Sequence, residues 1–148
     1  MIRLNPNVIA NKIDRMIARI DKLKVFQTYT IEQYLDDETS QLVIERLLEL
    51  VIQSALDING LLLKQVAGIN RVTNAESFNE TARAGFISIE AAQLLTSSGR
   101  FRNTLAHQYD EVAPEAVFQE FQTVLANYPD YIEAIQNYLD SREATSND

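Results

Sequence analysis

The sequence has no cysteine and only one histidine, His107, in 148 residues. Without cysteine there are no disulfides, no thiolate metal sites and no cysteine nucleophile. A lone histidine also excludes a zinc site built from several imidazoles, although carboxylate sites for Mg²⁺ or Mn²⁺ stay open. The residues single out no such site, and we expect neither a metal nor another cofactor.

Long apolar runs are also missing. The first residues, MIRLNPNVIANKIDRM, lack the continuous apolar segment of a secretory signal, and no stretch reaches the ~18 uncharged apolar residues that span a membrane. The nearest approach, residues 44–63, contains the charged residues Glu45, Arg46, Glu49 and Asp57. We therefore expect a cytoplasmic protein without membrane contact, in which this segment is a buried helix.

Glycine and proline are scarce, with four and three residues, while 46% of the residues are hydrophobic and 23% are charged. This composition is typical of a folded protein and excludes collagenous, low-complexity and largely disordered chains. Since a domain commonly has ~150 residues, the length predicts one domain. We expect it to span residues 1–140, with a frayed polar tail over residues 141–148.

Helix signals recur along the chain, and no segment has a convincing strand pattern. Asn5 and Pro6 are suited to the cap and first position of a helix, whose apolar residues, Ile17 included, fall in one arc. The predicted helices cover residues 6–26, 36–66, 76–84, 88–108 and 114–139. Residues 28–35 are expected to form a connection or single turn, and Pro129 to kink the last helix or start another. The expected fold is all-α, an up-and-down bundle of about five helices.

The helix predicted to end near Val66 has apolar residues around most of its axis, so it is central or buries one side against another chain. Gly60 costs about 1 kcal/mol relative to alanine in a helix interior, and close approach of another helix would explain it. Glu49 and Asp57 could support a cleft, but we expect them to be exposed or capping residues.

Charge is distributed unevenly. The net charge is −8, which argues against an extended electrostatic grip on nucleic acid. Residues 1–74 hold nine basic and nine acidic residues, whereas residues 75–148 hold four basic and twelve acidic ones. Arg100 and Arg102 form a local basic island there, and a basic stripe on the first helix is either a solvated face or a contact for phosphates: Lys12, Arg15, Arg19 and Lys22.

The segment around the histidine reads GRFRNTLAHQYD and contains Arg102-x4-His107-x-Tyr109. It resembles the R-x4-6-H signature of the HEPN superfamily, and R-N-x-L-x-H-x-Y is similar to the version in HepT-like toxins. The upstream helix ERLLELVIQSALDIN and the acidic helix after the motif extend the resemblance from about Gln33 to Leu139.

This resemblance implies an α-helical homodimer with metal-independent endoribonuclease activity at a cleft where two copies of the motif meet. It also implies a toxin-antitoxin system. HepT-like toxins are typically encoded beside a minimal nucleotidyltransferase antitoxin, MntA, which uses ATP to adenylylate the motif tyrosine. Tyr109 holds that position here.

The side chains fit this chemistry by their own properties. An imidazole titrates near pH ~6.5 and suits a general acid or base, and a guanidinium offers a planar fork to phosphate oxygens. We therefore assign acid and base work to His107 and phosphate stabilisation to Arg102. Asn103 is expected to make an orienting hydrogen bond to His107 or to the phosphate, and Arg100 to bind RNA together with Arg102. AMP on Tyr109 would compete with RNA for Arg102.

Helix geometry separates these groups within one chain. Arg102 and His107 are about 140° apart around a continuous helix, whereas Asn103 is about 40° from His107 and Tyr109 nearly coincides with Arg102. They converge only in a groove facing both ridges or across a two-fold axis, which favours a dimer. The alternative is a non-catalytic helical subunit that binds a nucleotidyltransferase or a nucleotide. Apart from the motif, a single histidine is usually structural or solvent-exposed, and Tyr109 could simply pack at the helix end.

Overall fold

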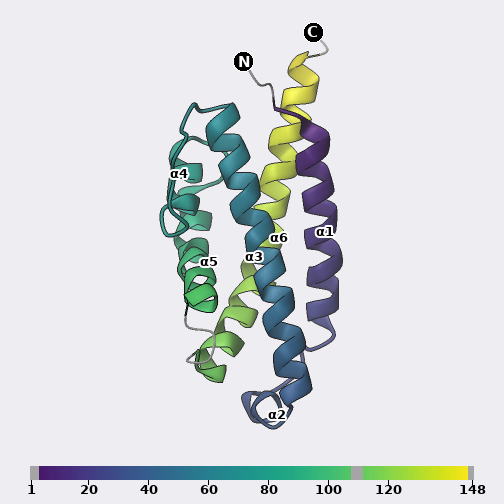
Figure 1. The fold of residues 1–148 in the computed structure, drawn as a ribbon. Coiled ribbons are helices and arrows are strands. Elements are labelled where there is room, and N and C mark those ends of the chain that lie inside the picture. The colour runs from purple at the N-terminus through teal and green to yellow at the C-terminus, as the bar shows by residue number, and fades with distance from the viewer. Residues whose placement is uncertain (1–3, 108–111, 147–148) are drawn as a thin grey trace.

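The computed structural model describes residues 4–107 and 112–146, and six helices lie within these ranges (Figure 1). They are α1 (Pro6–Lys24), α2 (Ile31–Leu35), α3 (Glu38–Gln65), α4 (Ser77–Arg83), α5 (Ile89–His107) and α6 (Pro114–Ser146). The described ranges contain no strand. The predicted all-α fold is confirmed, and the helix beyond the predicted five is α2, where a connection or a single turn was expected.

The long helices run in alternating directions (Figure 1). The chain descends through α1, returns through α3, descends again through α5 and rises through α6, so the architecture is the expected up-and-down bundle. No helix within the described ranges is both long and apolar enough to cross a membrane.

Side-chain caps mark three helix starts, including the one predicted at Asn5. The side chain of Asn5 accepts a hydrogen bond from the Asn7 amide at 3.0 Å, and Pro6 occupies the first turn. Asp37 accepts from the Ser40 amide at 3.1 Å, and Ser88 accepts from the Ala91 amide at 3.0 Å. Each acceptor satisfies a backbone donor that has no partner inside the helix.

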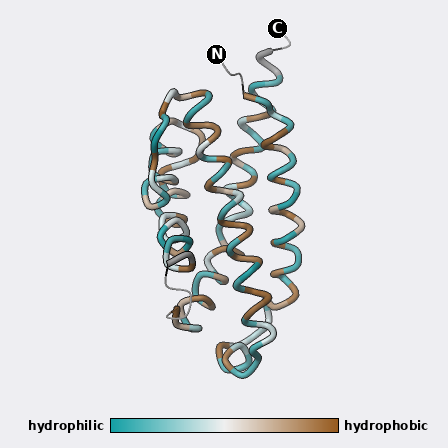
Figure 2. Tube along the Cα trace, in the orientation of Figure 1, coloured by the Kyte–Doolittle hydropathy of each residue, from teal (hydrophilic) through white to brown (hydrophobic). Residues whose placement is uncertain are grey.

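The core forms where the apolar faces of the helices meet around α3. Buried residues of α1 recur at helical spacing and lie against α3: Ile9, Ile13, Met16, Ile20 and Leu23. Hydrophobic and hydrophilic residues alternate along α1 and α3 with the short period expected of helices with a buried face (Figure 2). Ile17 is an exception to the predicted arc, because it is 37% exposed.

α6 is one helix with Pro129 inside it, and it continues through residues 141–146, which were expected to form a frayed tail. Buried residues recur along it at intervals of three and four: Val117, Phe121, Val124, Tyr128, Tyr131 and Ile135. This apolar face passes Pro129 without interruption, and Pro129 itself is exposed. Packing on both sides of the proline therefore holds the helix together despite the lost backbone hydrogen bond.

Two interior glycines have opposite surroundings. A Cβ added at Gly60 would meet no atom within 4 Å, so the predicted close approach does not occur there within the described chain. A Cβ at Gly99 would collide with the backbone carbonyl of Asn74. The close approach therefore lies at Gly99, where α5 contacts the loop before α4, and not at Gly60.

Buried polar side chains join the helices. The Tyr131 hydroxyl on α6 donates to Asn59 Oδ1 on α3 at 2.6 Å, and Asn59 Nδ2 donates to Ser77 Oγ on α4 at 2.9 Å. About three turns earlier on α6, Glu120 Oε1 accepts from Ser98 Oγ on α5 at 2.6 Å. Because buried polar groups need partners, these contacts fix the register between the helices.

Candidate functional site

The predicted site residues lie near the end of α5. Arg100, Arg102 and Asn103 are on its described part, and His107 is its last residue. The side chain of His107 and the whole of Tyr109 lie outside what the structure describes. Arg102 and His107 therefore share one helix, as expected, while the roles assigned to His107 and Tyr109 stay predictions.

Arg102 reaches from α5 to α3. Its Nε donates to Gln53 Oε1 at 3.0 Å, and its Nη2 lies 3.6 Å from Glu49 Oε1. The Arg102 side chain is 22% exposed, so the guanidinium is held in place and remains in contact with solvent. The Gln53 contact fixes the Nε edge, and Glu49 partly neutralises the outer edge.

Gln53 and Glu49 belong to a polar face of α3, which also includes Arg46 and Asp57. Successive members are three or four residues apart and lie on one side of the helix. Arg46 Nη1 lies 3.2 Å from Glu49 Oε2, and Gln53 Nε2 donates to Asp57 Oδ1 at 2.8 Å. The Nζ of Lys12, from the basic stripe on α1, lies 3.7 Å from Asp57 Oδ2. The polar face of α3 thus joins α1 to the arginine of α5.

Glu49 is more than the expected exposed or capping residue, because it is partly buried and contacts Arg102. Asp57 is exposed as expected, and it also contacts Gln53, which holds Arg102. Gln53 was not identified from the sequence at all. The signal was present, since polar residues at intervals of three and four interrupt an otherwise apolar helix. The sequence did not show that this polar face contacts Arg102, because that contact depends on the packing of α5 against α3.

Asn103 has a partner from a distant part of the chain. Its Oδ1 accepts a hydrogen bond from Asn74 Nδ2 at 2.8 Å. The Asn103 side chain is exposed, and its Nδ2 makes no hydrogen bond within the described residues. The carbonyl acceptor is therefore occupied while the amide donors face solvent.

Arg100 and Arg102 do not form a joint basic island. Two positions apart on a helix means about 200° of rotation, so the two side chains leave α5 in nearly opposite directions. Arg102 contacts α3, whereas Arg100 is exposed. Arg100 can contact RNA only on another face of α5.

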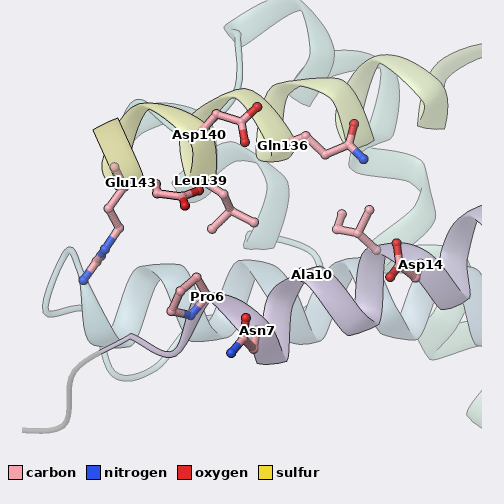
Figure 3. Close-up of a pocket in the computed structure, with 10 residues that line it drawn as sticks. Pro6, Asn7, Ala10, Asp14, Gln136, Leu139, Asp140 and Glu143 are labelled. Atoms are coloured by element: carbon pink, nitrogen blue, oxygen red, sulfur yellow. The ribbon is translucent and has the colours of Figure 1, made fainter. Parts of the chain in front are cut away.

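The molecule also has a groove between the start of α1 and the end of α6, with a volume of about 390 Å³ (Figure 3). Apolar residues of both helices line it, including Pro6, Ala10 and Leu139, and Asp14 and Asp140 lie at its sides. Arg100, Arg102 and Asn103, the predicted site residues whose side chains are described, do not line this groove. The contacts of Arg102 place the described part of the site between α5 and α3.

Fold and motif together define a helical bundle that carries a tethered arginine and a histidine on one helix. The family model described as "Ribonuclease HepT-like" matches residues 13–136. The chain is 33% identical over 139 residues to tRNA nuclease HepT of Aphanizomenon flos-aquae, across 94% of this chain and 95% of that protein. The chain therefore belongs to the HepT-like ribonuclease family, which confirms the resemblance found in the motif.

A solved structure supports the fold independently. The chain resembles YutE, a cytosolic protein of unknown function from Bacillus subtilis, with a TM-score of 0.78 and 16% sequence identity. The likeness covers 96% of this chain and 95% of YutE. It shows that the whole six-helix arrangement, and not only the motif helix, recurs in another protein.

Proposed function

We propose that the protein is an endoribonuclease that cleaves RNA without a metal ion. Family membership supports this function, and the observation that carries it in the structure is the tethered Arg102. Its guanidinium is fixed through Nε by Gln53, and among the described residues Nη1 has no partner. A cation held in this way can bind the scissile phosphate with little loss of side-chain freedom.

In the proposed reaction an imidazole removes the proton from a ribose 2′-hydroxyl, and that oxygen attacks the adjacent phosphorus. The bond between phosphorus and the 5′-oxygen breaks, and the leaving oxygen takes a proton from an acid. The products are a 2′,3′-cyclic phosphate and a free 5′-hydroxyl. Arg102 stabilises the charge that accumulates on the phosphoryl oxygens.

A homodimer would supply the second proton-transfer group. Each chain has one histidine, whereas the reaction needs a base and an acid. Two copies of His107 meeting across a two-fold axis would fill both roles. The azimuth between Arg102 and His107 supports the same arrangement, because one straight helix cannot direct both groups at one phosphate.

The proposed substrate is a structured RNA such as a tRNA. The HepT relative is named as a tRNA nuclease. A net charge of −8 does not favour wrapping of long RNA. Recognition by a few local contacts, from Arg102, Asn103 and the exposed Arg100, suits a compact substrate better.

The proposed role is that of a toxin that a MntA-like nucleotidyltransferase neutralises. The tyrosine hydroxyl would attack the α-phosphate of ATP, and pyrophosphate would leave. AMP on Tyr109 would add a phosphate and a purine to the motif and compete with RNA for Arg102. An increase in intact mass by one or more AMP groups after co-expression with the nucleotidyltransferase, lost in Tyr109→Phe, would support this regulation; an unmodified wild type would contradict it.

The activity itself is tested with purified protein, transfer RNA and EDTA. We expect cleavage by the wild type, and losses of about a hundredfold or more in His107→Ala and Arg102→Ala. The control is Arg83→Ala, which removes an exposed arginine that pairs with Glu80 on α4. Unchanged cleavage by His107→Ala would refute the proposal. A wild type that binds a nucleotidyltransferase but cleaves no RNA would favour the non-catalytic subunit.

A further inference from the structure

The contact between Asn74 and Asn103 joins the loop before α4 to the motif on α5. Asn74 Nδ2 donates to Asn103 Oδ1 at 2.8 Å, although the two residues are 29 positions apart in the sequence. Asn103 follows Arg102 directly and lies one helical turn before His107. A residue from outside the motif therefore contacts the middle of the motif.

The backbone of Asn74 is held in place from three sides. Its carbonyl oxygen packs on Gly99 of α5, which tolerates the contact only because it lacks a Cβ. The same carbonyl accepts the Ser77 amide at 3.4 Å at the start of α4. On one flank, Thr73 Oγ1 accepts the Glu76 amide at 3.2 Å, and on the other, Ser77 Oγ accepts the buried Asn59 side chain at 2.9 Å. The position of Asn74 is therefore set by the core and not by its own side chain.

This arrangement gives the Asn103 amide a direction. A side-chain amide has one acceptor end and one donor end. Asn74 occupies the acceptor end, and the donor end of the exposed Asn103 has no hydrogen-bond partner among the described residues. Anionic oxygens of a phosphate accept hydrogen bonds, so only this orientation lets Asn103 donate to a phosphate.

We propose that Asn74 is a positioning residue, which holds the Asn103 amide with its N–H groups toward the RNA phosphate. This inference rests on the proposed function and adds to it a residue from another element. Asn74 does not touch the substrate itself. It acts through Asn103, and it does so because the close approach at Gly99 brings it onto α5.

The test is a double-mutant cycle of single-turnover cleavage rates with Asn74→Ala, Asn103→Ala and the double variant. We expect Asn74→Ala to lower the rate about tenfold, which is the effect of one lost hydrogen bond, with no loss of thermal stability beyond a few degrees. The double variant is expected to cleave as slowly as Asn103→Ala alone, because Asn74 acts only through Asn103. Additive losses would overturn the inference.

The isosteric Asn74→Asp variant tests the orientation itself. A carboxylate accepts but cannot donate, so the Asn103 amide should turn over and present its oxygen to the phosphate. We expect a larger loss than in Asn74→Ala. The matched control is Asn70→Asp, which adds the same charge at an exposed position of the same loop and is expected to cleave within about twofold of the wild type. Equal losses in both aspartate variants would overturn the inference.

Failure of the inference is distinguishable from failure of the proposed function. If Asn103→Ala is impaired while Asn74→Ala cleaves like the wild type, the inference is wrong and the nuclease stands. If the wild type does not cleave RNA, or Asn103→Ala is fully active, the role of Asn103 in the proposed function is wrong and the inference is overturned with it.

Discussion

Arg102 has two neighbours on α3 with opposite expected effects on catalysis. Gln53 holds the Nε edge of the guanidinium in place, whereas Glu49 offers a carboxylate to the outer edge that a phosphate would occupy. A positioning contact should increase the rate, and a competing anion should weaken RNA binding. The two residues can therefore be separated by experiment.

Replacing Gln53 by alanine is expected to lower the cleavage rate by about tenfold or more, because a hydrogen bond to a charged group is lost and Arg102 becomes free to move. Single-turnover rates measure this effect. The control is Gln41→Ala, which removes another glutamine of α3, one that donates to the Tyr34 carbonyl at 2.8 Å and not to Arg102. Wild-type rates in Gln53→Ala would show that Arg102 needs no tether.

Replacing Glu49 by glutamine is expected to strengthen RNA binding by about twofold to fivefold, since it removes a partly exposed carboxylate that competes for the guanidinium. The gain should shrink as salt is raised, because exposed charges are screened. Affinity at two ionic strengths measures both effects. Glu38→Gln makes the same charge change in the first turn of α3 and should bind like the wild type. Weaker binding in Glu49→Gln would mean that Glu49 orients Arg102.

At the scale of elements, α5 is fixed by contacts to three neighbours. Gly99 meets the loop before α4, Ser97 and Ser98 donate to Glu120 of α6, and Arg102 reaches α3. The motif helix is therefore not an isolated helix that carries a signature. Its position depends on residues that the motif does not contain.

The two interior glycines should respond in opposite ways to alanine. Gly99→Ala is expected to lower the free energy of unfolding by about 1–3 kcal/mol, because the Cβ collides with the Asn74 carbonyl. Gly60→Ala is expected to raise it by up to about 1 kcal/mol, because the Cβ meets nothing and alanine favours the helix. Denaturant unfolding of both variants measures these changes in the free energy of unfolding. A destabilised Gly60→Ala would place another chain against that glycine.

Glu120 should make stability depend on pH. Burial raises the pKa of its carboxyl above 4.5, against the opposing effect of the Ser98 and Ser97 hydroxyls. A raised pKa in the folded state means that the protonated form contributes stability at low pH, and this contribution is lost as pH rises through the folded pKa. Glu120→Gln is therefore expected to melt at a higher temperature than the wild type at pH ~7, with the difference vanishing near pH ~4. A lower melting temperature at neutral pH would contradict this.

At the scale of the whole molecule, charge and proposed assembly belong together. The acidic excess lies in residues 75–148, the same half that carries Arg102 and His107. Local cations in an acidic surrounding favour short, selective contacts over non-specific RNA binding. A second copy of the chain would double the number of such cations at one cleft.

The proposed dimer predicts a particle of twice the chain mass in light scattering, and a specific activity that falls on dilution below the dissociation constant of the dimer. The physical reason is that one chain offers a single imidazole for two proton transfers. An active monomer at all concentrations would refute a shared site. Water or the substrate would then have to supply the second role.

The sequence determined the helices, because caps and apolar spacing are local properties: Asn5 caps the first helix as predicted, and α3 and α5 begin close to their predicted starts at residues 36 and 88. It also determined the family, through an arginine, a histidine and a tyrosine at fixed spacing. The motif could be recognised because it is local as well: its members lie within one short segment.

The tertiary structure alone decided what surrounds that segment. The contacts of Gln53 and Glu49 with Arg102, of Asn74 with Asn103, and of Asn74 with Gly99 join residues far apart in the chain. It likewise decided that Pro129 stays inside α6, where packing outweighs the local preference of proline. Such pairings depend on how the helices pack against one another, and the sequence of a single segment does not determine that packing.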